Sequence, residues 1–172
     1  MTSSNERKEE QLNDIIEDFS YAMLTTKFTD RMLFHARPMR IVDYNEETNT
    51  IRFISGMDAD KIDEIIRHPL AVITMQNGAR CVSLSGYTSV KKDQALVEEL
   101  WEPQMNIWFD GKDDPNIGVI EFRPEKGEYW DMASGSLVKS LVKEAKAFLT
   151  GEKPSWETPL NSKIDFKDQT RA

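Results

Sequence analysis

The chain has 172 residues, of which 39% are hydrophobic, and its formal net charge is −8. This length predicts one domain that buries a core without disulfide or metal staples. The acidic balance argues against a general nucleic-acid binder, and no apolar run approaches the about 20 residues of a membrane-spanning helix. The polar N-terminus MTSSNERKEEQ and the single cysteine, Cys81, predict a cytoplasmic protein without a secretory signal or a disulfide framework.

A helix is predicted first, over residues 5–19. Its apolar positions recur at i, i+3, i+4 and i+7, which is the spacing of one buried helix face. These positions are Leu12, Ile15, Ile16 and Phe19. The pattern indicates a helix packed on the body of the domain.

Two strands are predicted next, over residues 21–26 and 32–42. Pro38 lies inside the second strand, and proline has no backbone N–H to donate, so this strand is expected at a sheet edge or at a bulge. Arg37 and Arg40 flank the proline. The pattern allows either a side chain aimed at a ligand or an ordinary surface salt bridge.

Residues 51–68, IRFISGMDADKIDEIIRH, are predicted to form a strand that breaks at Gly56 and then opens a helix. Asp58 or Asp60 is expected to cap that helix. Its buried stripe is predicted to consist of Ile62, Ile65 and Ile66. Lys61 adds a positive charge at the helix N-terminus. The junction is therefore either a phosphate cradle or an ordinary capped helix.

Two further strands are predicted in the middle of the chain, over residues 70–76 and 81–92, joined by a hairpin at Asn77-Gly78. The second strand alternates strictly, and one of its faces is small and mostly polar. That face carries Cys81, Ser83, Ser85, Tyr87 and Ser89. It is expected to line a ligand groove or a subunit interface, or to be a half-exposed sheet face.

The remaining elements complete an antiparallel α+β pattern that predicts a small barrel of six or so strands. They are a helix over 93–101 with an Asp cap, strands over 117–123 and 127–132, and a helix over 136–149. The domain is predicted to span residues 1–151, followed by an extended or disordered tail over 152–172. His35, His68 and Cys81 show no metal-ligand spacing, so no metal site is predicted.

Six stretches follow one another in a distinctive order. They are HARPM at 35–39, FISGMDADKIDEI at 53–65, CVSLSG at 81–86, ELWEPQMNIWF at 99–109, DDPNIGVIEFRPEKGEYWD at 113–131 and AKAFLTG at 145–151. Together they resemble the general-stress-protein branch of the pyridoxamine 5′-phosphate oxidase-like family over most of residues 10–151. The resemblance implies an antiparallel six-stranded split β-barrel that forms a homodimer and holds FMN at the dimer interface.

The resemblance also implies a set of flavin-binding residues. These are Arg37, Pro38, Met39, Ile54, Ser55, Lys61, Cys81, Val82, Ser83 and Trp130. Arg37 would lie near the phosphate or ribityl end of the flavin, and Lys61 would bind the phosphate. Ile54 and Ser55 would touch the isoalloxazine edge, and Trp130 would lie near the ring.

Three positions depart from the family pattern. Ala59 replaces a serine that is frequent in the phosphate loop, and Asp60 places a carboxylate near the phosphate. Residues 132–136, MASGS, stand where true pyridoxamine phosphate oxidases carry an R-L-H-D-R-like motif, so pyridoxine phosphate oxidation is not expected.

The expected function is therefore that of an FMN-dependent oxidoreductase of unknown substrate, with the redox chemistry supplied by the flavin and no catalytic residue singled out. One alternative is a non-enzymatic flavin-binding or stress-response module. Another is a protein whose phosphate site has decayed and that binds a different ligand or none.

Overall fold

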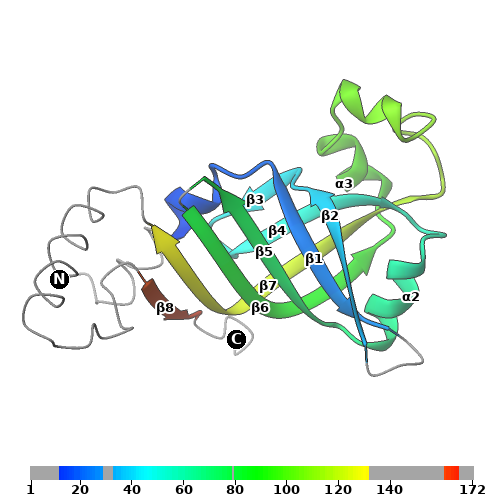
Figure 1. Cartoon of the computed structure of the whole chain (residues 1–172). Coiled ribbons are helices and arrows are strands. Elements are labelled where there is room, and N and C mark those ends of the chain that lie inside the picture. The colour runs from blue at the N-terminus through cyan, green and yellow to red at the C-terminus, as the bar shows by residue number, and fades with distance from the viewer. Residues whose placement is uncertain (1–11, 29–32, 79, 132–160, 167–172) are drawn as a thin grey trace, which may run out of the picture.

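An antiparallel sheet that curls on itself carries the fold in this computed structural model, which describes residues 12–28, 33–78, 80–131 and 161–166 (Figure 1). The strand order is β2-β1-β5-β6-β7-β4-β3, and β8 pairs with β7 outside this path. The strands are β1 Tyr21–Lys27, β2 Phe34–Arg40, β3 Asp43–Asn45, β4 Thr50–Gly56, β5 Leu70–Asn77, β6 Arg80–Lys91, β7 Ile117–Asp131 and β8 Asn161–Asp165.

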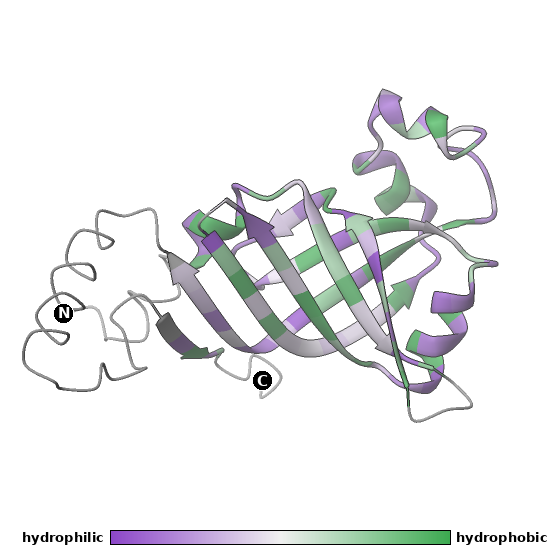
Figure 2. Cartoon of the chain, in the orientation of Figure 1, coloured by the Kyte–Doolittle hydropathy of each residue, from purple (hydrophilic) through white to green (hydrophobic). Residues whose placement is uncertain are grey.

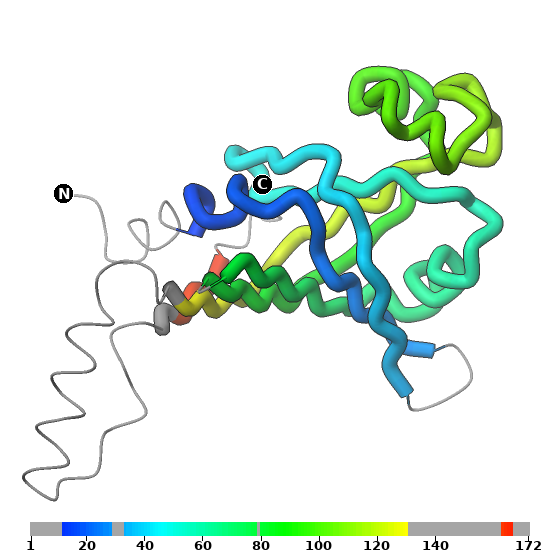
Figure 3. The backbone as a smooth tube through the Cα atoms, turned by 45° about the horizontal axis from the view of Figure 1, so that its top comes forward, coloured from blue at the N-terminus to red at the C-terminus, as the bar shows by residue number. Residues whose placement is uncertain are grey.

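Helical segments are short in the described part of the chain. They are α2 Asp60–Arg67, α3 Gln94–Glu99, the 3-10 turn η1 Pro103–Ile107 and residues 12–16. Helix α2 and the α3–η1 segment lie at one end of the sheet, and β8 lies at the opposite end (Figures 1 and 3). None of the helices described is long and apolar enough to span a membrane.

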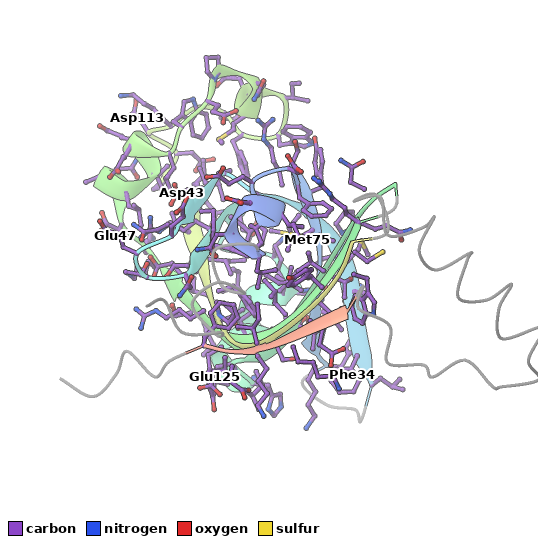
Figure 4. All side chains as sticks on the ribbon, turned by 90° about the vertical axis from the view of Figure 1, so that its left-hand side faces the viewer. Phe34, Asp43, Glu47, Met75, Asp113 and Glu125 are labelled. Atoms are coloured by element: carbon purple, nitrogen blue, oxygen red, sulfur yellow. The ribbon has the colours of Figure 1, made fainter. Side chains whose placement is uncertain are left out.

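The core lies on the concave side of the curled sheet. Strands β5 and β6 alternate buried and exposed residues, as expected for strands with one face turned inward. Figure 2 shows hydrophobic and hydrophilic residues interspersed along these strands. Phe53, Phe122 and Ile73 are among the fully buried side chains. Figure 4 shows Met75 inside the curl, whereas Phe34 and Glu125 project from its margin. Burial of these apolar side chains is the main term that holds the sheet in its curled form.

The predicted class, an antiparallel α+β split barrel with flanking helices, is confirmed, but the strand number was underestimated. Eight strands are present among the described residues instead of six. Strand β3 falls between the strand predicted over 32–42 and the one that begins at residue 51, and β8 falls in the predicted tail. The two strands expected over 117–123 and 127–132 are one continuous strand, β7. The helix predicted over 136–149 lies outside the described residues.

Strand β7 continues through Pro124, and a β-bulge lies next to the proline. Ser85 pairs with Lys126 while Gly86 pairs with Pro124, so Glu125 is an extra residue on β7. Pro124 stands directly beside this bulge, and bulges are among the places where a strand tolerates a residue without an N–H donor. The Glu125 carbonyl is not lost to the ladder entirely, because it accepts a hydrogen bond from the Phe166 N–H at 2.9 Å.

The expectation that Pro38 marks an edge strand is confirmed. Strand β2 ends the sheet order and, among the described strands, pairs with β1 alone, where Pro38 faces Met23. The predicted cap of α3 is also confirmed, since the Asp93 carboxylate accepts a hydrogen bond from the Leu96 N–H at 3.2 Å.

Two expectations for α2 were wrong. Its N-cap residue is Ala59, which offers no side-chain acceptor, instead of Asp58 or Asp60. Ile66 is exposed although it was assigned to the buried stripe, and Glu64 is buried in its place. The helix packs against β1 and β6, and its Glu64 carboxylate accepts hydrogen bonds from Thr26 of β1 and Arg37 of β2, so its buried face is rotated away from Ile66.

A second buried carboxylate ties four strands together. Glu121 of β7 is only 2% exposed. Its Oε1 lies 3.0 Å from Arg52 Nε, and its Oε2 lies 2.8 Å from Lys91 Nζ. Arg52 also donates through Nη1 to Asp43 Oδ2 at 2.7 Å. The network joins β3, β4, β6 and β7 beside the small apolar cluster that includes Val97.

Candidate anion-binding site

Three side chains from β1 and β2 converge on Glu64 of α2. Arg37 donates through Nη2 to Glu64 Oε2 at 2.5 Å. The Thr26 hydroxyl donates to the same carboxylate oxygen at 2.5 Å. His35 Nδ1 lies 3.5 Å from the other oxygen, Oε1. The antiparallel pairing of β1 with β2 brings His35 opposite Thr26, and so sets the alignment of the cluster.

Only one terminal nitrogen of the Arg37 guanidinium, Nη2, takes part in these contacts. The Arg37 side chain is 14% exposed, and its Nη1 is buried without a hydrogen-bond partner among the described residues. A buried donor with no acceptor costs roughly 1–3 kcal/mol, so an acceptor that reached this nitrogen would be bound favourably. Guanidinium groups suit phosphate and carboxylate because their N–H groups form a planar fork.

Lys61 brings a second positive charge to the same place. It precedes Glu64 by three residues on α2, a spacing that puts both on one side of the helix. Burial and the Arg37 guanidinium lower the pKa of Lys61, whereas Asp58, Asp60 and Glu64 act in the opposite direction. Arg37 and Lys61 therefore lie within electrostatic reach of each other, and an anion near both would relieve their repulsion.

Glu64 is charged in this cluster. Burial alone would raise its pKa, but the hydrogen bonds from Thr26 and Arg37, the Arg37 charge and the contact with His35 lower it. Sequence reasoning did not single out this residue, because only the isoleucines of the helix were assigned to its buried face. The available signal was its position between two buried isoleucines on a helix of eight residues.

The residues predicted at the isoalloxazine edge lie on opposite faces of β4. Ser55 is buried, and its hydroxyl donates to the Gly56 carbonyl at 3.0 Å. Ile54 points to the other face, where it packs with Val97 and its neighbours. Each of these two side chains therefore meets a different part of the molecule.

The other predicted site residues divide between the core and the convex face. Met39 and Val82 are buried in the main core cluster. Pro38 is exposed, and Cys81, Ser83 and Trp130 are partly exposed. Strand pairing sets Cys81 directly opposite Trp130 and Ser83 opposite Glu128, so Cys81, Ser83 and Trp130 share the convex side. The structure thus brings Arg37 and Lys61 together at α2, and Cys81, Ser83 and Trp130 together on β6 and β7.

The two departures in the phosphate loop have different consequences. Ala59 has no side-chain donor and is the N-cap of α2. Asp60 is exposed to solvent. A carboxylate in water is strongly screened, so Asp60 repels an anion at this site weakly.

Comparisons with known proteins agree on one family. Residues 7–155 match the family model described as "Pyridoxamine 5′-phosphate oxidase like". General stress protein 26 of Bacillus subtilis (strain 168) is 28% identical over 91 residues, which are 50% of this chain and 65% of that protein. The match therefore spans less than two thirds of that relative's length.

Solved structures show the same fold. The General Stress Protein 26 from Bacillus anthracis str. Sterne gives a TM-score of 0.64 at 19% identity, over 72% of this chain and 93% of that one. A pyridoxamine 5′-phosphate oxidase-related, FMN binding protein from Nostoc punctiforme PCC 73102 gives a TM-score of 0.51 at 15% identity, over 73% and 81% of the two chains. Since the family model covers most of the chain, the protein belongs to the pyridoxamine 5′-phosphate oxidase-like family.

Proposed function

We propose that this protein binds FMN and uses it as an oxidoreductase, with Arg37 and Lys61 holding the flavin phosphate. The observation that carries the proposal is the buried, unpartnered Nη1 of Arg37 beside the second cation, Lys61. Family membership supports it, as does a structural relative that is named an FMN binding protein.

The residues at this place fit a phosphate group. Arg37 Nη1 offers a buried N–H donor, and Lys61 offers a charge whose repulsion with Arg37 an anion would relieve. When bound, FMN would supply hydride or electron transfer at its ring. The chain's own residues would bind the phosphate, exclude water from Arg37 and fix the orientation of the flavin.

The direct test is titration of the purified protein with FMN, followed by flavin fluorescence and the visible spectrum. Saturable quenching, or a protein that is yellow as purified, is expected. Absence of quenching at generous FMN concentration would refute the proposal. Turnover of NADH or NADPH against an acceptor then distinguishes an enzyme from a carrier.

A lysine substitution tests the phosphate role. Lys61→Ala is expected to weaken FMN binding about 10-fold to 100-fold, because a charge-assisted hydrogen bond is lost. Riboflavin, which lacks the phosphate, should bind the variant and the wild type about equally. Lys126→Ala is the matched control, since Lys126 is an exposed lysine on β7, and β5 and β6 separate that strand from β1. Equal weakening of FMN and riboflavin by Lys61→Ala would contradict a phosphate contact.

The convex face supports a homodimer with the flavin at its interface. It exposes large apolar side chains on neighbouring strands, namely Tyr21, Met23, Leu70 and Tyr87. Leu70 and Tyr87 are paired directly across β5 and β6. Apolar residues exposed together on a sheet face are typical of a surface that another protein covers. Pro38, Cys81, Ser83 and Trp130 share this face, so a second copy would bring them toward a flavin at the interface.

Leu70→Glu is expected to convert the dimer into monomers, because it buries a charge in the interface. Ile66→Glu is the control, since Ile66 on α2 is 66% exposed and Leu70 is 62% exposed. Sedimentation velocity at several protein concentrations measures the outcome. Loss of FMN affinity in the monomeric Leu70→Glu variant is expected as well. A monomeric wild type, or a Leu70→Glu variant that stays dimeric, would contradict the interface.

A non-enzymatic flavin-binding module is the second candidate. One observation favours it: the carboxylate nearest to the anion site, Glu64, is already engaged by Arg37 and Thr26. Burial would raise the pKa of Glu64, but the contacts with Thr26, Arg37 and His35 lower it, and a carboxylate with a lowered pKa is a weak general base. Binding of FMN without turnover of any tested electron donor would select this candidate.

A further inference from the structure

We infer that Glu64 is a positioning residue for the anion site: it fixes the Arg37 guanidinium so that Nη1 is presented to the flavin phosphate. The inference rests on the proposed function, which gives Arg37 and Lys61 the phosphate. The flavin-binding residues implied by the resemblance did not include Glu64.

The contacts show how the carboxylate fixes the arginine. Glu64 is 2% exposed, and its Oε2 accepts from both Arg37 Nη2 and the Thr26 hydroxyl at 2.5 Å. The hydroxyl bond restrains the carboxylate from the β1 side, and the helix restrains it from the α2 side. One terminal nitrogen of Arg37 is therefore anchored, and the planar fork leaves the other, Nη1, in a defined direction. A buried site whose groups are held before binding loses less entropy when the ligand arrives.

The charge of Glu64 has a separate effect on the same site. Arg37 and Lys61 contribute two positive charges, and the negative charge of Glu64 offsets one of them. The carboxylate thus positions the arginine but also weakens the attraction for an anion. Removing only the charge and removing the whole anchor should consequently change FMN binding in opposite directions.

Glutamine separates these two roles. In Glu64→Gln, the amide carbonyl can take the place of Oε2 and accept from both Arg37 and Thr26. The amide nitrogen then takes the place of Oε1, 3.5 Å from His35 Nδ1. The anchor stays while the negative charge is lost. In Glu64→Ala both are lost, and Arg37 is free to leave its buried position.

The experiment measures the ratio of riboflavin to FMN dissociation constants for the wild type and the variants by fluorescence quenching. The wild type should favour FMN. Glu64→Ala should lower the ratio about 10-fold or more, the scale of one charge-assisted hydrogen bond. Glu64→Gln should keep the wild-type ratio or raise it. Riboflavin affinity should change by less than about 3-fold in both variants, because the phosphate contact alone is affected.

Each other result has a definite meaning. A wild type that does not distinguish FMN from riboflavin refutes the phosphate site itself, and the inference with it. A wild type that favours FMN, with an unchanged ratio in Glu64→Ala, refutes only the positioning role. A Glu64→Gln ratio as low as that of Glu64→Ala also refutes it, because the anchor would then be irrelevant.

A second pair of variants covers the case in which Glu64→Ala does not fold. Glu64→Asp keeps the charge but shortens the side chain by one methylene, so it should draw the guanidinium away from the phosphate and lower the ratio. Thr26→Val removes one donor to the carboxylate while the Arg37 contact remains. It should lower the melting temperature and leave the ratio of riboflavin to FMN dissociation constants close to that of the wild type. A Glu64→Asp variant with the wild-type ratio overturns the inference.

Discussion

Replacing Glu121 with alanine is expected to lower the free energy of unfolding by about 2–3 kcal/mol. The substitution leaves Arg52 and Lys91 without the buried carboxylate that pairs with both of them. Arg52 keeps its ion pair with Asp43, but its Nε loses its acceptor and Lys91 loses its partner. A buried group left without its partner is more costly than the loss of one surface ion pair. Urea denaturation at pH 7, followed by circular dichroism, measures the change. Lys163→Ala, which removes an exposed ion pair with Glu128, is the control and should change stability by less than about 1 kcal/mol.

The same carboxylate predicts a pH dependence. The contacts with Lys91 and Arg52 lower the pKa of Glu121 from its ordinary value of 4.5, although burial opposes them. The charged form is thus favoured in the folded protein. Its contribution is fully present above the unfolded pKa and is lost as the pH falls through the lower, folded pKa. The stability difference between the wild type and Glu121→Gln should shrink as the pH is lowered below about 4.5. A difference that is constant with pH would argue against this account.

Gly86→Ala is expected to destabilise the fold by about 3 kcal/mol or more. A Cβ on Gly86 would lie 2.0 Å from the Arg123 carbonyl oxygen and 2.7 Å from the Pro124 Cα. Both contacts are with backbone atoms of the neighbouring strand, so no side-chain rotation relieves them. The bulge at Glu125 would have to move, and with it the pairing of β6 with β7.

Ser85→Ala is the matched control for Gly86→Ala. Ser85 is the preceding residue on β6 and is exposed, so its substitution should change the free energy of unfolding by less than about 0.5 kcal/mol. Urea midpoints of the two variants give the comparison. A Gly86→Ala protein that unfolds at the wild-type urea concentration would mean that the bulge adjusts freely.

Much of the sheet is predictable because its strands carry their own pattern. The alternation along β6 and the apolar run of β5 reflect local burial, which depends only on neighbouring residues. The continuity of β7 through Pro124 is not local, since the bulge that permits it needs Gly86 from another strand. The strand character of residues 161–165 likewise depends on pairing with β7.

The candidate site was predictable to a smaller extent for the same reason. Lys61 stands out in the sequence as a cation at a helix start, and Arg37 as a neighbour of an edge proline. The proximity of Arg37 to helix α2 depends on the packing of α2 against the sheet, which no local pattern encodes. The burial of Glu64 follows from that packing as well. A pattern of isoleucines predicts an apolar stripe and gives no sign that a charged residue completes it.

Strand β8 has a consequence for association between unfolded or nascent chains. Strand β4 pairs with β7 only over residues 117–122, and β8 pairs with residues 126–130 farther along the same side. Without β8, that stretch of β7 would present open backbone donors and acceptors, which recruit strands from other molecules. During synthesis, residues 126–130 are made before residues 161–165, which pair with them. Until residues 161–165 leave the ribosome, intermolecular strand pairing competes with folding.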